Sequence, residues 1–257
     1  MNYIGIDIGS TCAKTVVLNE KKEIIQEFVQ PTGWSSIDTA EKILQKLKLA
    51  EISLSDDSSC CVATGYGRIS VPYADKAVTE ITCHALGAVH LFQQPDLTVI
   101  DIGGQDTKII QIEQGFVKDF IMNDKCAAGT GRFLEVMANT ISLRPNEMFE
   151  LARLGSDTTI SSMCTVFAES EVIGLIGKGE PKENIAYAVV DSTIRKVTAQ
   201  LSRMNGEMST FCLTGGLCEC EYIREALSKK LGKEVISNPD ARYAGAIGAA
   251  LSAMKIR

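Results

Sequence analysis

Hydrophobic and polar positions alternate at the start of the chain, as they do in a strand with one buried face. Isoleucines alternate with small or polar residues from Ile4 to Ile8, and this period of two predicts a strand over 3–8. The glycine-containing run 9–11 is expected to be a turn, and the run 14–18, which ends in Val-Val-Leu, predicts the returning strand of a hairpin. A third strand is expected over 24–29.

Later segments carry apolar residues three and four positions apart, which predicts helices with one buried face. The expected helices span 38–49, 79–92, 130–141, 165–177, 184–204, 220–231 and 243–254. Short apolar runs predict further strands over 60–63, 211–216 and 235–237, and 64–68 is expected to be a loop. The last helix is rich in glycine and alanine, so we expect it to pack closely on a neighbour. The pattern therefore predicts a mixed α/β protein.

A second hairpin, over 98–110, repeats the first at a constant distance. Ile-Asp-Ile-Gly occurs at 6–9 and again at 100–103, and Lys14 has its counterpart in Lys108, so the offset is 94 residues. Two such hairpins in successive parts of the chain predict a duplicated domain. The expected subdomains are 1–95 together with the C-terminal helix 243–257, and 96–242.

Composition and charge exclude several classes of protein. The 257 residues are 45% hydrophobic and 23% charged, which excludes collagen, coiled coils and disordered chains. A net charge of −6 without a basic block argues against nucleic-acid binding. No apolar run is long enough to span a membrane, and the first residues do not look like a signal peptide. We therefore expect a cytoplasmic protein without a membrane partner.

Each hairpin has the features of a loop that binds nucleotide phosphate. A glycine turn can direct several backbone N–H groups at one anion, and Ser10, Thr11 and Lys14 add hydroxyl groups and charge. An aspartate cannot bind phosphate, so Asp7 is expected to hold the accompanying Mg²⁺ through water. One hairpin alone is better explained by a turn-initiating aspartate. The matched pair and the Thr-Gly-Gly turn at 214–216 favour phosphate binding.

This arrangement resembles the actin, Hsp70 and sugar-kinase ATPase superfamily, whose two aspartate hairpins hold the phosphates and whose later Gly-Gly turn holds adenosine. The resemblance implies a duplicated, ribonuclease H-like ATPase fold with a nucleotide cleft between two subdomains. The spacings of the P-loop and of the Rossmann fingerprint are both absent from the sequence, which disfavours those two nucleotide-binding folds.

Nine cysteines are too few for a disulfide scaffold and more than an ordinary cytoplasmic enzyme carries. Three of them lie in apolar segments and are expected to fill the core: Cys60, Cys61 and Cys83. Another three, Cys212, Cys218 and Cys220, could offer thiolates to a metal. A closed zinc site needs four ligands, and both histidines are remote in sequence, so a metal site there is disfavoured.

Cys126 and Cys164 are different because each is expected to precede a helix directly. The N–H groups and dipole at a helix N-terminus stabilise a thiolate or an anionic cluster. Two cysteines cannot complete a four-thiolate iron–sulfur cluster, but a two-fold homodimer would supply four, with the cluster on its axis. The spacing alone favours the simpler alternative, in which both are structural thiols.

The longer sequence segments around the two cysteines favour a role as cluster ligands over a role as structural thiols. The sequence reads NDKCAAGTGRFLEV from Asn123 and CTVFAESEV from Cys164. These runs, with those at 63–68, 99–106 and 245–251, resemble the 2-hydroxyacyl-CoA dehydratase activators, a family that includes the ATPase subunits of benzoyl-CoA reductase. The similarity covers essentially the whole chain.

The resemblance implies an oxygen-sensitive, ATP-driven one-electron donor. It implies a homodimer with one [4Fe–4S] cluster between the subunits, bound by Cys126 and Cys164 of each chain. A ferredoxin or flavodoxin would supply the electron, and an iron–sulfur dehydratase or a double-cubane-cluster protein would accept it. ATP binding and hydrolysis would rotate the two subdomains and thereby control the transfer.

The resemblance also implies the nucleotide-binding residues. Asp7 would hold Mg²⁺, Asp101 would orient water or metal, and Gln105 would join them in catalysis. Arg242 stands where the family usually has glutamine, and an arginine there could stack on adenine or reach a phosphate. The remaining residues that would bind the nucleotide are Gly9, Ser10, Thr11, Cys12, Ala13, Lys14, Gly103, Gly104, Gly215, Gly216 and Ala241.

Two other classes of protein explain part of the sequence. A sugar or acyl kinase of the same fold would need a carboxylate base, for which Glu80 is a candidate, although acidic residues are common at helix starts. The chain is also short for a sugar kinase. An ATP-dependent scaffold related to actin would leave Cys126 and Cys164 without a role. Protein purified without oxygen would be brown only if it carried a cluster.

Overall fold

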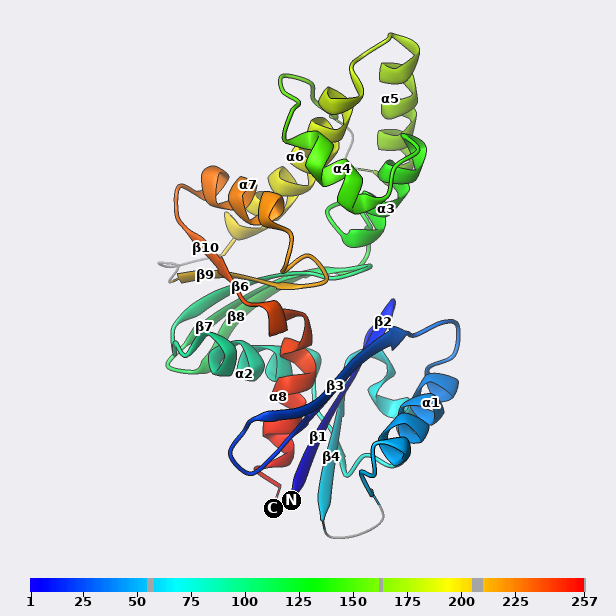
Figure 1. The fold of residues 1–257 in the computed structure, drawn as a ribbon. Coiled ribbons are helices and arrows are strands. Elements are labelled where there is room, and N and C mark those ends of the chain that lie inside the picture. The colour runs from blue at the N-terminus through cyan, green and yellow to red at the C-terminus, as the bar shows by residue number, and fades with distance from the viewer. Residues whose placement is uncertain (55–57, 162–163, 205–209, 257) are drawn as a thin grey trace. The chain divides into compact units, whose positions relative to one another are not determined.

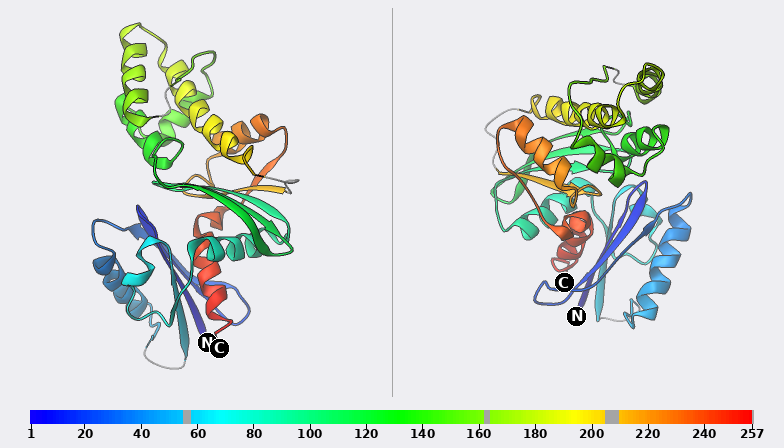
Figure 2. Two further views of the ribbon diagram at one scale, coloured as in Figure 1. Left: turned by 180° about the vertical axis from the view of Figure 1, so that it is seen from behind. Right: turned by 45° about the horizontal axis from the view of Figure 1, so that its top comes forward.

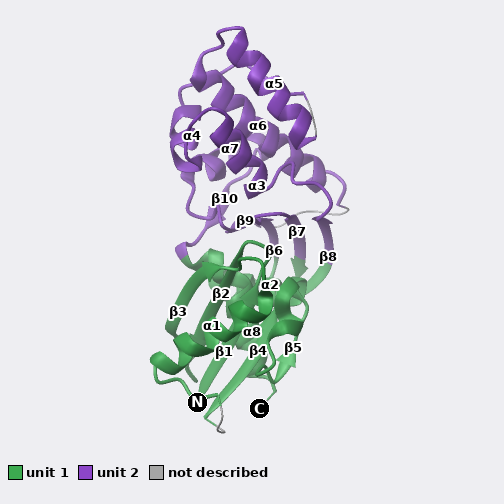
Figure 3. Cartoon of the chain, turned by 90° about the vertical axis from the view of Figure 1, so that its right-hand side faces the viewer, with its two compact units in different colours: residues 1–96, 112–118, 240–257 green, residues 97–111, 119–239 purple. Residues whose placement is uncertain are grey.

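The computed structural model describes residues 1–54, 58–161, 164–204 and 210–256, and the chain divides into two compact units (Figures 1 and 3). Unit 1 comprises residues 1–96, 112–118 and 240–257, and unit 2 comprises 97–111 and 119–239. The described residues form two five-stranded sheets. Among the described residues, no helix combines the length and the apolar character needed to cross a membrane.

The sheet of unit 1 has the strand order β3-β2-β1-β4-β5. Strands β1 and β2 form the predicted antiparallel hairpin, and β4 pairs with β1 in parallel. The strands are β1 (Asn2–Ile8), β2 (Cys12–Leu18), β3 (Ile24–Pro31), β4 (Ser59–Thr64) and β5 (Lys76–Ala77). The helices are α1 (Ser36–Leu49), η1 (Tyr66–Ser70), α2 (Glu80–Phe92) and α8 (Ala244–Ala253), and η2 (Pro239–Tyr243) leads into α8.

The alternation in β1 determines what packs on each face of this sheet. Ile4, Ile6 and Ile8 are fully buried in one cluster with apolar residues of α1, while α8 lies on the opposite face (Figure 2). Gly5 faces α8 so closely that a Cβ there would lie 1.8 Å from the Ala246 carbonyl oxygen. The predicted close packing of this last helix is therefore confirmed.

The second sheet, which unit 2 carries for the most part, repeats the topology of the first. Its order is β10-β9-β6-β7-β8, which read backwards matches β3-β2-β1-β4-β5 strand for strand. Asp7 lies beside Thr64 in the first sheet, and Asp101 lies beside Thr214 in the second. The predicted duplication is therefore confirmed by topology and register. The strands are β6 (Leu97–Ile102), β7 (Thr107–Glu113), β8 (Phe116–Asn123), β9 (Thr210–Gly215) and β10 (Val235–Ser237).

The described helices of unit 2, α3 to α7, lie together on one face of this sheet (Figure 1). They share a single core, in which Ile100, Ile102 and Leu213 of the strands pack with Phe133 and Val189 of the helices. The helices are α3 (Gly131–Thr140), α4 (Pro145–Ala152), α5 (Thr165–Gly177), α6 (Lys182–Leu201) and α7 (Glu221–Leu231).

Four segments differ from the expectation or were not predicted. The run 64–68, expected to be a loop, enters the 3₁₀ helix η1. Strand β8 escaped prediction because most of its side chains are exposed or half-buried, so it lacks a buried face with a clear period. Helix α4 has only eight residues, too few to establish a helical period. The two-residue strand β5 is too short for any pattern.

Candidate functional site

The first glycine loop, between β1 and β2, is held from behind and presents hydroxyl groups to solvent. Thr32 donates from its hydroxyl to the Gly9 carbonyl oxygen (2.7 Å) and from its backbone N–H to the Thr11 carbonyl oxygen (2.9 Å). Ser10 and Thr11 are exposed. The backbone is therefore anchored while two hydroxyl groups are available to a ligand, as a phosphate loop requires.

Asp7 lies buried at the end of β1 with glycines on two sides. A Cβ at Gly65 would lie 2.5 Å from Asp7 Oδ1, and one at Gly245 would lie 2.6 Å from Oδ2. Lys14 is its register partner on β2. Carboxylate oxygen is the donor that Mg²⁺ prefers, so the chemistry of Asp7 fits the expected metal role.

The second glycine loop carries a buried ionic cluster. The Lys108 ammonium lies 3.3 Å from Asp101 Oδ2 and 2.9 Å from Asp106 Oδ1. The Thr214 hydroxyl donates to Asp101 Oδ1 over 3.1 Å. Gln105 is exposed at the tip of the loop. The sequence predicted that Lys108 corresponds to Lys14, but it did not predict the ion pair between Lys108 and Asp106.

The second loop is hydrogen-bonded directly to the segment that carries Cys126. The Gly131 and Arg132 N–H groups at the start of α3 donate to the carbonyl oxygens of Gly103 (2.9 Å) and Gly104 (2.8 Å). Behind the loop, the Thr107 hydroxyl donates to the Gly129 carbonyl oxygen over 2.7 Å. A displacement of the loop would therefore be transmitted to residues 126–132.

The expectation that Cys126 directly precedes a helix is wrong. Helix α3 begins at Gly131 with Thr130 as its N-cap. A turn intervenes because Gly129 has a φ of +84° and both the N–H and the hydroxyl of Thr130 donate to the Ala127 carbonyl oxygen. Cys126 lies half-buried before this turn.

Cys164 is the N-cap of α5, as expected, and its side chain is exposed. Helix α5 lies at the periphery of the helical layer of unit 2 (Figure 1). Some of its apolar side chains are accessible: Val166, Phe167 and Ile173 are 67%, 66% and 57% exposed. Val166 and Ile173 are two helical turns apart along one face, and Phe167 lies beside Val166. Cys164 is thus continuous with an exposed apolar stripe.

Adjacent residues of α6 contact both cysteine-bearing segments. The Arg195 guanidinium donates to the Ile160 carbonyl oxygen (2.8 Å), four residues before Cys164. The next residue, Lys196, packs so closely on Gly129 that a Cβ there would lie 2.7 Å from its Cγ. A cavity of about 220 Å³ lies between these contacts. Both segments are therefore anchored on the same turn of one helix.

The Gly-Gly turn after β9 is tied to the segment that follows β10. Ser237 donates to the Cys218 carbonyl oxygen (2.6 Å), and Cys218 donates to that of Pro239 (3.9 Å). Ala241 is buried in unit 1. In the same unit, the pKa of Glu27 is raised above its ordinary value by burial and by the charge of Asp240, and the charge of Arg242 partly opposes this rise. The structure thus places Arg242 near a carboxylate of β3.

The profile of the BadF/BadG/BcrA/BcrD ATPase family matches residues 4–253, which include both glycine loops and both cysteine segments. The chain belongs to the BadF/BadG/BcrA/BcrD ATPase family. The expected family is therefore confirmed, and the family's description makes the protein an ATPase.

Solved and curated relatives agree with this assignment. The chain is 42% identical over 254 residues to the (R)-2-hydroxyglutaryl-CoA dehydratase activating ATPase of Acidaminococcus fermentans, covering 98% of this chain and 96% of the relative. The crystal structure of component A of the A. fermentans dehydratase has a TM-score of 0.91 at 41% identity, covering 100% and 98% of the two chains.

Two further solved structures bear on ligand and fold. The activator of 2-hydroxyisocaproyl-CoA dehydratase from Clostridium difficile, with bound ADPNP, has a TM-score of 0.88 at 35% identity, covering 100% and 95%. A ROK family glucokinase from Streptomyces griseus has a TM-score of 0.62 at 17% identity, covering 99% and 100%. The latter likeness concerns the fold alone, and it confirms the predicted sugar-kinase-like fold class.

Five other cysteines of this family member occupy structural positions. Cys60, Cys61 and Cys83 are buried, which confirms the expectation that they fill the core. Cys212 is buried in β9, and Cys220 is the N-cap of α7. Across residues 1–54, 58–161, 164–204 and 210–256, no group of three or more His, Cys, Asp or Glu side chains could hold a metal ion.

We expect alkylation of the metal-free protein at pH 8 to separate these cysteines. Burial raises the pKa of Cys83 to about 11 and also raises the pKa of Cys61 and of Cys212. Since only a thiolate reacts, iodoacetamide should modify exposed Cys164 in the folded protein and the three buried thiols only after denaturation. Peptide mass spectrometry measures this, and equal labelling of Cys83 and Cys164 in the folded state would refute it.

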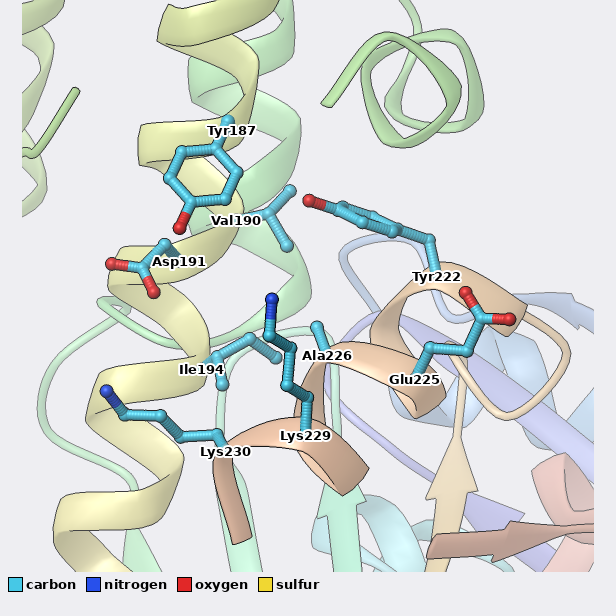
Figure 4. Close-up of a pocket in the computed structure, with 9 residues that line it drawn as sticks. All are labelled: Tyr187, Val190, Asp191, Ile194, Tyr222, Glu225, Ala226, Lys229 and Lys230. Atoms are coloured by element: carbon cyan, nitrogen blue, oxygen red, sulfur yellow. The ribbon is translucent and has the colours of Figure 1, made fainter. Parts of the chain in front are cut away.

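A separate cavity of about 450 Å³ lies between α6 and α7 (Figure 4). Tyr187 and Asp191 enter it from α6, and Tyr222 and Lys229 enter it from α7 (Figure 4). The residues that line it include none of the candidate site residues. The cavity therefore does not contribute to the site described above.

Proposed function

We propose that this protein is an ATP-driven one-electron donor that acts as a homodimer on a partner iron–sulfur enzyme. In this proposal units 1 and 2 are the two ATPase subdomains, and each contributes one phosphate loop. Relatives named as activators of 2-hydroxyglutaryl-CoA, lactoyl-CoA and 2-hydroxyisocaproyl-CoA dehydratases support the class of partner. The proposed acceptor is such a dehydratase or a double-cubane-cluster protein, and the proposed electron source is a ferredoxin or flavodoxin.

The observation that carries the proposal is the continuity between the second glycine loop and the Cys126 segment. Gly103 and Gly104 accept hydrogen bonds from the first N–H groups of α3 (2.9 and 2.8 Å). A loop that contacts a γ-phosphate changes position when that phosphate is lost. Because the loop and α3 share these bonds, hydrolysis would shift the segment that holds Cys126.

The loops supply the residues that the nucleotide needs. Ser10 and Thr11 would donate to the phosphates from unit 1, and the backbone of residues 103–105 would do so from unit 2. Asp7 would hold Mg²⁺ through water, and Asp101 and Gln105 would orient the attacking water. The backbone of Gly215 and Gly216 would contact the adenosine. The ADPNP bound to the C. difficile relative supports a nucleotide in this role.

Cys126 and Cys164 fit half of a site for a [4Fe–4S] cluster. Both belong to unit 2, both are accessible enough to reach an external ligand, and both segments are anchored on α6. A cluster of this type takes up and releases one electron when all four thiolates hold it. The two missing thiolates would come from a second copy of the chain. Because Cys164 is the N-cap of α5, the dipole of this helix would stabilise the anionic cluster.

The exposed stripe on α5 is the proposed homodimer contact. Val166, Phe167 and Ile173 expose their apolar side chains beside Cys164, and such patches mark protein interfaces. A copy related by two-fold symmetry would cover the stripe and bring its own Cys126 and Cys164 to the same axis.

Phe167→Glu should therefore convert the dimer to monomer, with a loss of iron in the same sample. A buried charge at an interface costs several kcal/mol, so the dissociation constant should rise by at least about 100-fold. Analytical ultracentrifugation under anaerobic conditions measures this. Phe116→Glu is the matched control, since Phe116 is also exposed (77%) but lies on β8. Dimerisation that survives Phe167→Glu would contradict this contact.

An anaerobic transfer assay tests the proposed function. The protein is reduced chemically, freed of reductant and mixed with a dehydratase partner in the presence of ATP, ADP or a non-hydrolysable analogue. The proposal predicts that each reduced dimer transfers its one electron in the presence of ATP, and not with ADP or the analogue. Transfer at the same rate without nucleotide, or phosphorylation of a small metabolite in place of transfer, would overturn it.

A further inference from the structure

Asp101, Asp106 and Lys108 form a closed ionic cluster beneath the second glycine loop. Lys108 Nζ lies between the two carboxylates at 3.3 and 2.9 Å, and no side chain of the three is more than 8% exposed. Lysine and aspartate are almost never buried to this degree unless they are paired. The three side chains therefore fix one another in position.

The two carboxylates differ in what their second oxygen contacts. Asp101 Oδ1 accepts a hydrogen bond from the Thr214 hydroxyl over 3.1 Å. Asp106 Oδ2 is buried and accepts no hydrogen bond from any residue that the structure describes. Leaving a buried acceptor unsatisfied costs about 1–3 kcal/mol, and more when it is charged. An oxygen of this kind requires a donor from outside the chain.

Asp106 also distinguishes the second loop from the first. At the offset of 94 residues that relates the hairpins, Asp106 matches Cys12, and fully buried Lys108 matches half-buried Lys14. The duplication alone therefore does not account for the second carboxylate. Its presence in one loop only points to a function of that loop.

The Asp106 side chain lies directly under the loop backbone. The Gly103 N–H donates to the Asp106 carbonyl oxygen (2.9 Å), and a Cβ at Gly103 would lie 2.4 Å from Asp106 Oδ1. A donor that reaches Oδ2 beneath so tight a loop must be small. Water meets that requirement, and water bound to a divalent cation is a strong donor to a carboxylate.

We propose that Asp106 accepts a hydrogen bond from a water that Mg²⁺ brings with the bound nucleotide, and that Lys108 is the positioning residue that aims this carboxylate. The inference rests on the proposed function, because it requires a nucleotide at the loop. Mg²⁺ retains several waters and commonly contacts carboxylates through them. Asp106 would then strengthen nucleotide binding only when the metal is present.

Calorimetric titration of ADP, with Mg²⁺ and with EDTA, tests this in the wild-type protein and in Asp106→Asn. The variant should bind ADP in EDTA as the wild type does. It should lose about 10-fold or more of the affinity that Mg²⁺ adds, which is the range for loss of an outer-shell partner. Urea denaturation of each variant checks that it is folded.

The double variant Asp106→Ala/Lys108→Met removes the pair together and leaves the net charge of the cluster unchanged. It should show the same loss, since the binding atom is gone. Retention of the Mg²⁺ effect in the double variant would show that overall charge matters, not Asp106, and would overturn the proposal. So would an equal loss of ADP affinity with and without Mg²⁺, or wild-type behaviour of Asp106→Asn. If the wild-type protein bound no ADP, the proposed function itself would fail.

Discussion

Cys126→Ser and Cys164→Ser should each lose the bound iron and the ATP-dependent electron transfer while they keep nucleotide binding. Changes to outer-shell partners of a metal site already cost 10–100-fold in affinity, so loss of a ligand should cost more than about 100-fold. Both residues lie in unit 2, outside the two glycine loops. ADP affinity should therefore change little. Iron analysis, the transfer assay and calorimetry measure the three quantities on one anaerobic preparation.

Cys220→Ser is the matched control for this pair. Cys220 is the N-cap of α7 as Cys164 is the N-cap of α5, and serine is a favourable N-cap residue. The control should keep iron and transfer at wild-type levels. If Cys220→Ser also lost iron, or if Cys164→Ser kept it, the assignment of the cluster ligands would be wrong.

Gly65→Ala and Gly215→Ala should be the most destabilising small substitutions near the site, each by about 3 kcal/mol. Both glycines have a left-handed φ, +82° and +83°, which costs an L-residue about 1–2 kcal/mol. In addition, a Cβ at either position would lie 2.5 Å from an aspartate oxygen, Asp7 Oδ1 or Asp101 Oδ1, and overpacking adds about 1–3 kcal/mol. Displacement of either aspartate should also abolish ATP hydrolysis.

Gly33→Ala and Gly179→Ala separate the two contributions to this cost. Both have a left-handed φ, +63° and +76°, but a Cβ at either would meet nothing within 4 Å. Their free energy of unfolding should therefore fall only by the conformational cost of about 1–2 kcal/mol, and they should keep ATP hydrolysis. Urea denaturation and an ATPase assay measure both effects. Equal destabilisation by Gly65→Ala and Gly33→Ala would contradict the packing argument.

Much of the fold could be predicted because its local signals are strong. Alternation marks β1, and the constant offset between Asp7 and Asp101 is enough by itself to identify the duplicated hairpins. The extent of the duplication could not be predicted from the offset. Thr64 and Thr214 occupy equivalent register positions, but the helices α3 to α6 lie between β8 and β9. The inserted helices change the spacing, so a constant offset cannot relate these residues.

Some features of the candidate site could likewise be predicted from local sequence, and others depend on the tertiary fold. Cys126 and Cys164 stand in long characteristic runs, so the sequence indicates them directly. The burial of Lys108, the hydrogen bonds from α3 to Gly103, and the contact of Lys196 with Gly129 depend on segments far apart in the sequence. No local pattern predicts such contacts. The predicted helix over 130–141 agrees closely with α3 (Gly131–Thr140), so the error lay in placing Cys126 directly before a helix that starts several residues later.

In the proposed function, two chains share one [4Fe–4S] cluster through Cys126 and Cys164. Native mass spectrometry of protein purified without oxygen tests it most directly, because it weighs the assembly and its bound atoms together. The proposal predicts one species containing two chains, about four iron and four sulfide, which becomes iron-free monomer or dimer in Cys164→Ser. A wild-type chain that is colourless and free of iron, or a monomer that carries a complete cluster alone, would contradict it.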